Sequence, residues 1–389
     1  MYRVRYITTT SMPKSLYFLL QDIYYQLVPW STPSRKVHVA FIVHPRTEED
    51  TIKKFPFLRF LPLPLVRALM KRFWVVSVAP IHVGEKRNEG IVLSIPLTAK
   101  QMLDDRKRAV RYIQDAYAYA HKRGARVVGL GALTASLTHG GTLLAATDAT
   151  PRITTGRLFT SLNVATLVER GVSALSRNKE TIVVSIVGAA GSIGSAVAQI
   201  LSYWGYTNFI LIDLSNKKER MEEIHSYIKE HNKKASVTIS DNLNDVKGSH
   251  VIVTATSKEG ALIMSEHVAP GVIIVDDAQP SDVDEALLMR DDLLILSGGA
   301  VRTPHVKIPF DMGLKDSSTI YSCLAEALLL NEMSHVRGSS LGEFRKIDMD
   351  TVQELKEVAT QFSFESGVFQ NNKRVYSDSD VEHMRSLHL

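Results

Sequence analysis

Cysteine is almost absent from this chain. Cys323 is the only one in 389 residues, which excludes an internal disulfide framework and is typical of proteins in a reducing compartment. The short apolar run at 16–20 is too brief for the core of a signal peptide. The sequence therefore predicts a cytoplasmic protein without an export signal.

Long uninterrupted hydrophobic runs are also missing. The most apolar stretch, 55–78, is broken by basic side chains and by prolines at 56, 62 and 64, so it cannot cross a bilayer as one helix. No transmembrane segment is expected. Two interpretations of 55–78 stay open: a cover over a core, or a surface that meets acyl chains or the membrane interface.

The chain lacks a strong charge of either sign. The net charge is +5, and the 46 basic residues are scattered among 41 acidic ones. No basic cluster is interleaved with stacking aromatics, so we expect no nucleic-acid partner. No spacing of histidine, cysteine and carboxylates resembles a zinc site, and no metal is expected. Homo-oligomerisation stays open.

Short apolar strands alternate with helical segments along the whole chain. The alternation is clearer in the second half, where it predicts a parallel sheet covered on both faces. The predicted strands are 37–43, 90–95, 126–130, 181–187, 209–213, 250–254, 272–275 and 293–296, and the predicted helices are 99–124, 162–175, 192–203, 217–230 and 320–333.

The fold class that follows is α/β with two domains, as the chain length also suggests. We expect an N-terminal α/β catalytic domain over 1–165 and a Rossmann-like nucleotide-binding domain with a doubly wound parallel sheet over 166–335. A helical C-terminal extension, 336–389, is expected to pack back on the N-terminal domain.

The segment IVGAAGSIGSAVA at 186–198 places three glycines between a predicted strand and a predicted helix. Gly188 permits a tight turn, Gly191 lets backbone amides approach a pyrophosphate, and Gly194 lets the helix pack close to the sheet. The helix N-terminus adds unpaired amides and a favourable dipole. The predicted cofactor loop consists of Gly188, Ala190, Gly191, Ser192, Ile193 and Gly194.

Asp213 ends the next predicted strand, where a carboxylate binds the adenosine ribose in dinucleotide-binding folds. Because it would repel a 2′-phosphate, NAD(H) is favoured, although Lys217 and Lys218 leave NADP(H) open.

Further cofactor contacts are expected at the ends of later strands. Thr254 ends one strand, and Gly298 and Gly299 follow another, where small residues let the chain run close to a nicotinamide ring or simply form a turn.

Eight segments resemble, in order and spacing, the cyanobacterial long-chain acyl-carrier-protein reductases and related bacterial proteins described as predicted amino-acid dehydrogenases. The resemblance runs from about residue 40 to the end. It implies a shikimate-dehydrogenase-like architecture. It also implies a reaction in which a cysteine accepts an acyl group from a thioester and hydride then releases an aldehyde. The segments are FIVHPR (41–46), IPLTAKQML (95–103), GLGALTASLT (129–138), TTG (154–156), VGAAGSIGSA (187–196), VDDAQP (275–280), LSGGAV (296–301) and CLAEALLL (323–330).

Cys323 stands at the position of the nucleophile that this resemblance implies. Residues 317–319 are candidate helix N-caps, which would put Cys323 in about the second turn, where a weak dipole favours a thiolate. A buried small hydrophobic side chain is the alternative. Glu326 shares its helix face and either orients a partner or forms an ion pair.

Thr154, Thr155 and Gly156 are expected to form an interdomain loop whose amides and hydroxyls hold the acyl carbonyl or the nicotinamide amide. The related proteins continue with asparagine, whereas this chain has Arg157, which leaves the substrate in doubt.

Four other polar side chains lie beside these motifs. Thr134 and Ser136 either line the same site or have ordinary turn roles, and His44 and His305 are more typical of structural hydrogen bonds than of proton donors.

The sequence thus favours an NAD(P)H-dependent reductase that converts an acyl thioester, acyl-ACP or acyl-CoA, to an aldehyde through an acyl-Cys323 intermediate. Acyl carrier protein is a candidate partner. One alternative is an amino-acid or hydroxy-acid dehydrogenase without covalent attachment, and another is a non-catalytic cofactor-binding sensor or docking protein.

Overall fold

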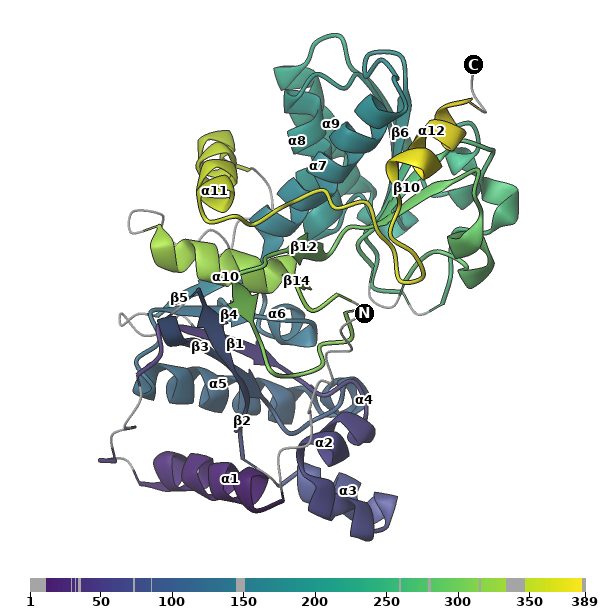
Figure 1. Cartoon of the computed structure of the whole chain (residues 1–389). Helices are drawn as coiled ribbons and strands as arrows, with labels where there is room; N and C mark the ends of the chain where they lie inside the picture. Colours follow the sequence, from purple (N-terminus) through teal and green to yellow (C-terminus); the bar gives the residue numbers. More distant parts are fainter. Residues whose placement is uncertain are drawn as a thin grey trace. The chain divides into compact units, whose positions relative to one another are not determined.

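The chain forms two compact units, shown in the computed structural model of Figure 1. Unit 1 comprises Met1–Gly156, Pro304–Ser318 and Cys323–Gly342, and unit 2 comprises Arg157–Thr303, Thr319–Ser322 and Glu343–Leu389. The structure describes residues 12–386 except 29, 32, 34–35, 73, 85, 145–150, 259, 279–280, 315 and 334–346. The chain leaves unit 1 between 156 and 157, whereas we expected the domain boundary at 165.

Unit 1 is built on a mixed six-stranded sheet with the order β13-β2-β3-β1-β4-β5. Strands β3, β1, β4 and β5 are parallel, so their carboxyl ends share one edge, and β2 and β13 add an antiparallel flank. The strands are β1 (Val39–Val43), β2 (Val76–Val83), β3 (Lys86–Ser94), β4 (Val127–Leu130), β5 (Arg152–Thr154) and β13 (Val306–Lys307).

Helices cover this sheet. They are α1 (Met12–Leu27), α2 (Glu48–Lys54), η1 (Pro56–Phe60), α3 (Leu63–Met70), α4 (Ala99–Asp104), α5 (Arg106–Lys122) and α6 (Leu133–Leu137), together with α10 (Ser322–Glu332), whose first residue belongs to unit 2. The predicted helix 99–124 is divided at Asp105, which leaves helical geometry and caps α5 by accepting the N–H of Arg108.

The apolar spacing predicted for 99–124 is the buried face of α4 and α5. Met102, Ala109, Ile113 and Ala116 are fully buried and belong to the main core cluster of unit 1, with side chains from β1, β3 and β4. This burial holds α5 against the sheet, as the helical period requires.

Unit 2 has a parallel six-stranded sheet with the order β11-β10-β9-β6-β7-β8, which confirms the predicted Rossmann-like doubly wound fold. The order reverses between β6 and β9, and all carboxyl ends lie at one edge. The strands are β6 (Val183–Val187), β7 (Asn208–Ile212), β8 (Ser236–Ser240), β9 (Val251–Thr254), β10 (Ile273–Asp276) and β11 (Leu294–Ser297).

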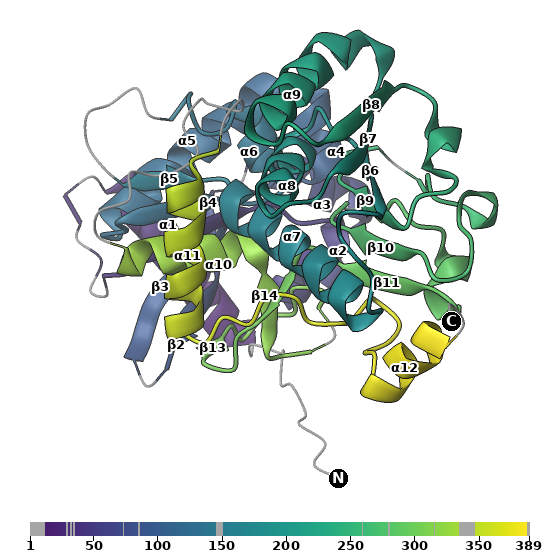
Figure 2. The same cartoon turned by 90° about the horizontal axis from the view of Figure 1, so that it is seen from above.

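In unit 2, α8 follows β6 and α9 follows β7 along the chain. Both helices lie beside the strands β6, β7 and β8 (Figure 2). The helices of unit 2 are α7 (Arg157–Ala174), α8 (Ser192–Tyr203), α9 (Lys218–His231), α11 (Met349–Gln361) and α12 (Asp378–Ser386), with short turns η2 (Ser215–Lys217), η3 (Leu243–Val246), η4 (Ser265–His267) and η5 (Glu285–Met289). A small antiparallel ribbon pairs β12 (Ala300–Arg302) with β14 (Thr319–Tyr321).

The C-terminal extension packs on unit 2, whereas we expected it on the N-terminal domain. Helix α11 contacts α7, and backbone bonds join Arg302 and Glu365 in both directions, at 3.1 and 2.8 Å. The expectation failed because the unpaired backbone groups that the extension satisfies lie in unit 2.

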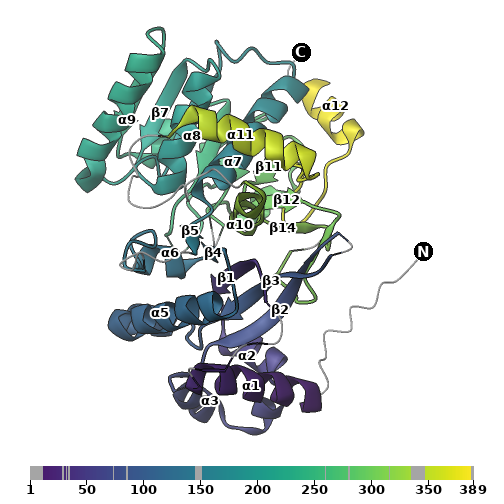
Figure 3. The same cartoon turned by 90° about the vertical axis from the view of Figure 1, so that its left-hand side faces the viewer.

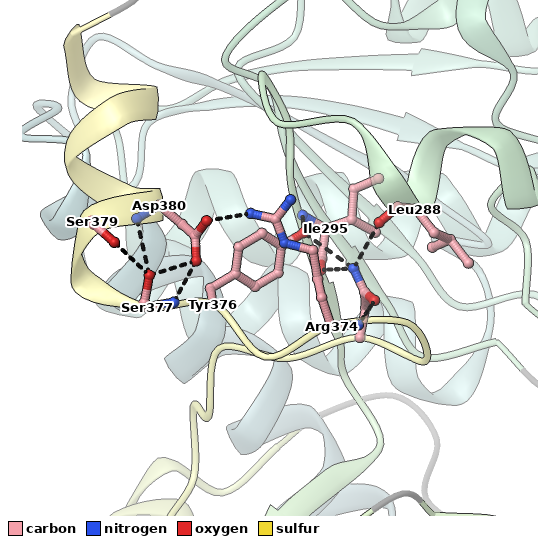
Figure 4. Close-up of polar contacts among 8 residues, drawn as sticks. Leu288, Ile295, Arg374, Tyr376, Ser377, Ser379 and Asp380 are labelled. Carbon is pink, nitrogen blue, oxygen red and sulfur yellow. Dashed lines mark hydrogen bonds and ion pairs between the residues drawn. The ribbon is translucent and has the colours of Figure 1, made fainter.

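Strand β11 is an edge strand, and the extension covers it (Figure 4). The N–H of Ile295 donates to the hydroxyl of Tyr376 at 3.0 Å (Figure 4). The N–H of Ser297 donates to the carbonyl of Gln370 at 2.8 Å. The side-chain amide of Asn371 donates to the carbonyl of Ile295 at 3.2 Å. These bonds occupy groups that would otherwise form an open sheet edge.

Candidate functional site

The glycine loop lies at the reversal point of the unit 2 sheet. Gly188 has φ +85°, and a Cβ there would lie 2.6 Å from the carbonyl oxygen of Ala255. A Cβ on Gly194 would overlap the carbonyl oxygen of Gly188, so the first turn of α8 crosses the loop without room for a side chain.

Gly191 is the N-cap of α8 and makes no side-chain cap bond. The first amides of a helix have no intrahelical partner, so those of Ser192 and Ile193 are available to a phosphate group. This bare, amide-rich cradle fits a dinucleotide pyrophosphate.

Asp213 follows β7, and its side chain is 6% exposed. One carboxylate oxygen accepts the N–H of Ala190 at 2.9 Å, and the other accepts that of Leu214 at 2.8 Å and lies 3.5 Å from Lys217 Nζ. Asp213 thus fixes the glycine loop.

Arg157, which departs from the related sequences, lies beside this loop. Its side chain is buried, and Nε donates to the carbonyl of Ser192 at 3.0 Å. A guanidinium bound to the first turn of α8 adds positive charge where the cradle would receive phosphate. No periodicity signalled this contact, because Arg157 is the first residue of a helix that is buried nearly all round.

Two aspartates at the end of β10 were missed as site residues, although the motif VDDAQP contained them. Asp276 accepts the hydroxyl of Thr254 at 2.7 Å, so the predicted Thr254 serves to orient a carboxylate. Asp277 is half-buried, and no hydrogen bond to its carboxylate comes from any described residue. Burial, then the neighbouring charge of Asp276, raise the pKa of Asp277 well above its ordinary value.

Gly298 and Gly299 form the turn after β11. A Cβ on Gly298 would lie 2.8 Å from Val164, and one on Gly299 would lie 3.3 Å from a carboxylate oxygen of Asp277. The absence of side chains lets this turn lie against Asp277 at the carboxyl edge of the sheet, where dinucleotide-binding folds place their ligand.

A second residue that sequence reasoning missed, Asn163, organises this turn. Its buried amide donates to the carbonyls of Gly298 at 2.5 Å and Ala300 at 3.1 Å, and its oxygen accepts the N–H of Gly367 at 3.0 Å. Asn163 is one of several polar residues in α7, so no pattern in the sequence marked it.

Cys323 is the second residue of α10, so it lies in the first turn and not the second. The predicted caps at 317–319 are wrong, because Thr319 is the first residue of β14. Gly156 adopts φ +76°, and a Cβ there would overlap Cα and Cβ of Cys323. The loop after β5 therefore lies directly against the half-exposed thiol residue.

Thr154 and Glu326 hold that loop against α10. Both are fully buried, and the Thr154 hydroxyl donates to the Glu326 carboxylate in a short hydrogen bond. The same hydroxyl accepts the N–H of Gly156 at 3.0 Å. Thr155, between them, is half-buried. Thr154 and Glu326 are thus engaged with each other within unit 1.

The other end of α10 is anchored by the same strand. Arg152, at the start of β5, donates to the carbonyls of Leu330 at 2.5 Å and Met333 at 2.7 Å, which satisfies groups left open at the helix C-terminus. Burial lowers the pKa of Arg152. Strand β5 therefore fixes α10 at both ends and sets the position of Cys323.

The remaining expected residues have local roles. The buried Thr134 donates to the carbonyl of Gly131 at 2.7 Å, and the exposed Ser136 donates weakly to that of Leu133. His44 follows β1, contacts the carbonyl of Pro45 at 2.9 Å, and has a pKa lowered by burial.

His305 is exposed. Within the described part of the chain, no group of three potential metal ligands gathers, and no helix is long and apolar enough to span a membrane.

Comparison with known families finds a match for part of unit 2. Residues 167–295 match the family described as shikimate / quinate 5-dehydrogenase. This part of the chain is a shikimate-dehydrogenase-like domain of Rossmann type. The match supports a nicotinamide cofactor and an oxidoreductase activity.

Two characterised proteins are similar over a longer stretch. The aminotransferase PigE of a Serratia species is 27% identical over 279 residues, 71% of this chain, but the match spans only 32% of that protein. The long-chain acyl-[acyl-carrier-protein] reductase of Synechococcus elongatus is 23% identical over 275 residues, 67% of this chain and 76% of that protein.

Among solved structures, the L-tryptophan dehydrogenase of Nostoc punctiforme resembles the chain with a TM-score of 0.39 and 13% identity, covering 90% of this chain and 87% of that one.

Proposed function

We propose that this protein is an NAD(P)H-dependent reductase that converts an acyl thioester to an aldehyde through an acyl-Cys323 intermediate. The observation that carries the proposal is the position of the only thiol, in the first turn of α10 and directly against the loop 154–156. The similarity to the acyl-carrier-protein reductase of Synechococcus elongatus supports the same chemistry.

The thiol has a setting that favours its reactive form. A first-turn position at a helix N-terminus stabilises a thiolate, and Cys323 is partly exposed. Its sulfur attacks the thioester carbonyl, the carbon–sulfur bond to the carrier breaks, and the carrier leaves as a thiol that takes up the proton lost by Cys323. The exchange of one thioester for another is close to balanced in free energy.

The cofactor held by unit 2 supplies, when bound, the hydride that turns the acyl-cysteine into an aldehyde and restores the thiolate. The glycine loop, Arg157 and Asp213 would hold its diphosphate and ribose. Thr154 and Glu326 act as positioning residues that fix the loop beside Cys323.

The proposal requires Cys323 and the nicotinamide to meet. Chain connectivity supports this requirement, because Cys323 directly follows Ser322, which belongs to unit 2 and donates its N–H to the carbonyl of Gly299 at 2.9 Å.

Intact-mass spectrometry tests the covalent step. After incubation with an acyl-CoA and no cofactor, the wild-type chain should gain the mass of one acyl group. Cys323→Ala should gain none and lose aldehyde formation by at least about a thousandfold. It should still bind NADH, measured by fluorescence titration. Aldehyde output from Cys323→Ala equal to that of the wild type would contradict the proposal.

The match of 167–295 to shikimate / quinate 5-dehydrogenase favours one competing activity, a dehydrogenase of small acids without covalent attachment. It predicts cofactor turnover with free acids and a tolerated Cys323→Ala substitution. Product identification with thioesters and free amino or hydroxy acids, assayed side by side, separates the two activities. Cofactor binding without turnover on either panel would instead indicate a sensor or docking protein.

A further inference from the structure

Helix α1 buries Leu19 and Tyr25, but it also carries a set of large apolar side chains that face away from the protein. Five exposed residues follow a helical spacing along one side, with exposed fractions of 44, 62, 57, 53 and 60%. We call this set the outer face of α1. It consists of Leu16, Tyr17, Leu20, Tyr24 and Leu27. No charged side chain belongs to it.

The opposite side of α1 carries polar residues, and these attach it to the protein. Asp22 is buried and accepts the N–H of Ser77 at 2.8 Å and the hydroxyl of Tyr119 at 2.7 Å. Gln26 donates to the carbonyl of Val75 at 2.7 Å and accepts its N–H at 3.2 Å. These bonds fix the rotation of α1 about its own axis, so that the outer face is held toward solvent.

The neighbouring segment η1–α3 adds more exposed apolar surface. Leu19 of α1 shares a core cluster with Val66 and Met70 of α3, and Figures 1 and 3 both show α1, α2 and α3 gathered at the same end of unit 1. Phe60 and Leu65 are 72 and 45% exposed. Soluble proteins seldom expose so many large apolar side chains together unless the surface binds something.

The charge of this segment identifies the kind of partner. Residues 53–78 contain six basic and no acidic side chains, and the first 21 residues of the chain contain no acidic side chain either. Arg59, Lys71 and Arg72 are exposed, and the guanidinium of Arg59 lies 5.0 Å from the ring centre of Phe60. Basic residues beside exposed leucine and aromatic side chains are the pattern of helices that lie in the interface of an anionic bilayer.

We propose that the outer face of α1, together with η1 and α3, is a docking surface for an anionic lipid bilayer. The uncharged outer face inserts among the acyl chains near the headgroups, and the exposed Arg59, Lys71 and Arg72 contact the anionic headgroups, whereas Arg67 is paired with Glu48. An acidic protein partner would gain little from the outer face, which offers it no cation. This inference is independent of the catalytic proposal.

Vesicle cosedimentation tests it with the full chain. The wild type should bind vesicles of phosphatidylcholine with phosphatidylglycerol much more strongly than vesicles of phosphatidylcholine alone. Leu20→Glu and Tyr24→Glu should each reduce the partition coefficient by at least about tenfold. Met289→Glu, on a side chain of unit 2 that is 63% exposed, is the matched control and should leave binding unchanged.

A second pair of variants tests the electrostatic part. The two substitutions Lys71→Glu and Arg72→Glu, made together in one variant, should abolish the preference for phosphatidylglycerol. Added salt should weaken binding of the wild type to these vesicles but not remove it. Thermal melts show that each variant is folded.

Three outcomes overturn the proposal. One is the absence of cosedimentation by the wild type, and another is an equal effect of Met289→Glu and Leu20→Glu. The third is that the wild type does not bind vesicles but forms a stable dimer, or a complex with acyl carrier protein, that Leu20→Glu disrupts.

Discussion

Gly194 shows how a missing side chain shapes the nucleotide unit. The first turn of α8 passes so close to the carbonyl group of Gly188 that a Cβ would overlap its oxygen. The contact is with backbone, which cannot rotate away as a flexible side chain can.

We therefore expect Gly194→Ala to displace the glycine loop and to weaken NADH binding by at least about tenfold, or 1.4 kcal/mol. Fluorescence titration measures the affinity. Tyr203→Ala, on a side chain that is 62% exposed at the other end of α8, is the control and should bind NADH normally. An unchanged affinity in Gly194→Ala would refute the role of this close crossing.

The carboxyl group of Asp277 should make stability depend on pH. Because its pKa is raised in the folded state, the folded protein binds a proton more tightly than the unfolded chain. Its contribution is complete below the unfolded pKa of roughly 4 and is lost as the pH rises through the folded value.

Asp277→Asn should therefore gain stability relative to the wild type as the pH rises from about 4 toward neutrality, because the variant has no charge to bury. Urea unfolding at several pH values measures this difference. Asp241→Asn, at an exposed position of the same unit, is the control. A difference from the wild type that does not change with pH would rule out the assigned cause.

Among single residues, the sequence was informative where the residue type is suited to one structural role, such as glycine in a tight turn. The three loop glycines and Asp213 lie at strand or helix ends, as the patterns indicated, whereas Cys323 lies in the first turn of α10 and not in the predicted second turn. The roles of Asn163 and Arg157 were not predicted, because their partners are backbone carbonyls that are distant in sequence. No local pattern encodes such pairs.

Among the elements, β11 depends on a segment that follows it by 70 residues or more. The N–H of Ile295 has the Tyr376 hydroxyl as its acceptor, and both residues are buried. Asn371 also donates to that hydroxyl, at 3.1 Å.

Tyr376→Phe removes the acceptor and leaves a buried donor unsatisfied, so we expect a loss of about 1–3 kcal/mol in the free energy of unfolding. Chemical denaturation measures it. Tyr203→Phe, on an exposed ring, should cost little. A loss no greater than that of the control would mean that solvent satisfies Ile295 and that the segment is a loose cover.

Helices and strands were predictable where their sequences showed a clear pattern of apolar residues. Helix α8 has its predicted bounds, because a glycine cap precedes a sustained apolar run. Helix α1 was missed because leucine and tyrosine occupy both its buried and its exposed side, so its apolar residues do not mark a single buried face. Strand β8 was missed because it is half-exposed and its sequence is largely polar. Strand β14 was predicted as the start of α10, because a strand of three residues is too short to show a pattern.

For the whole molecule, the order of the domains was predictable, but their composition was not. The alternation of strands and helices indicated a nucleotide-binding second half. No local signal shows that residues 304–318 and 323–342 return to unit 1, because that return depends on pairing between β13 and β2 and on the bonds from Arg152 to α10.

This return sets a condition on synthesis. When residue 303 has left the ribosome, unit 1 still lacks β13 and α10, and unit 2 still lacks β14 and the cover of β11. Unit 1 must therefore wait for residues 304–342, and the edge of β11 must wait for the segment that contains Gln370 and Tyr376. Until then the growing chain carries one sheet that lacks a strand and another with an open edge, and both need protection from aggregation.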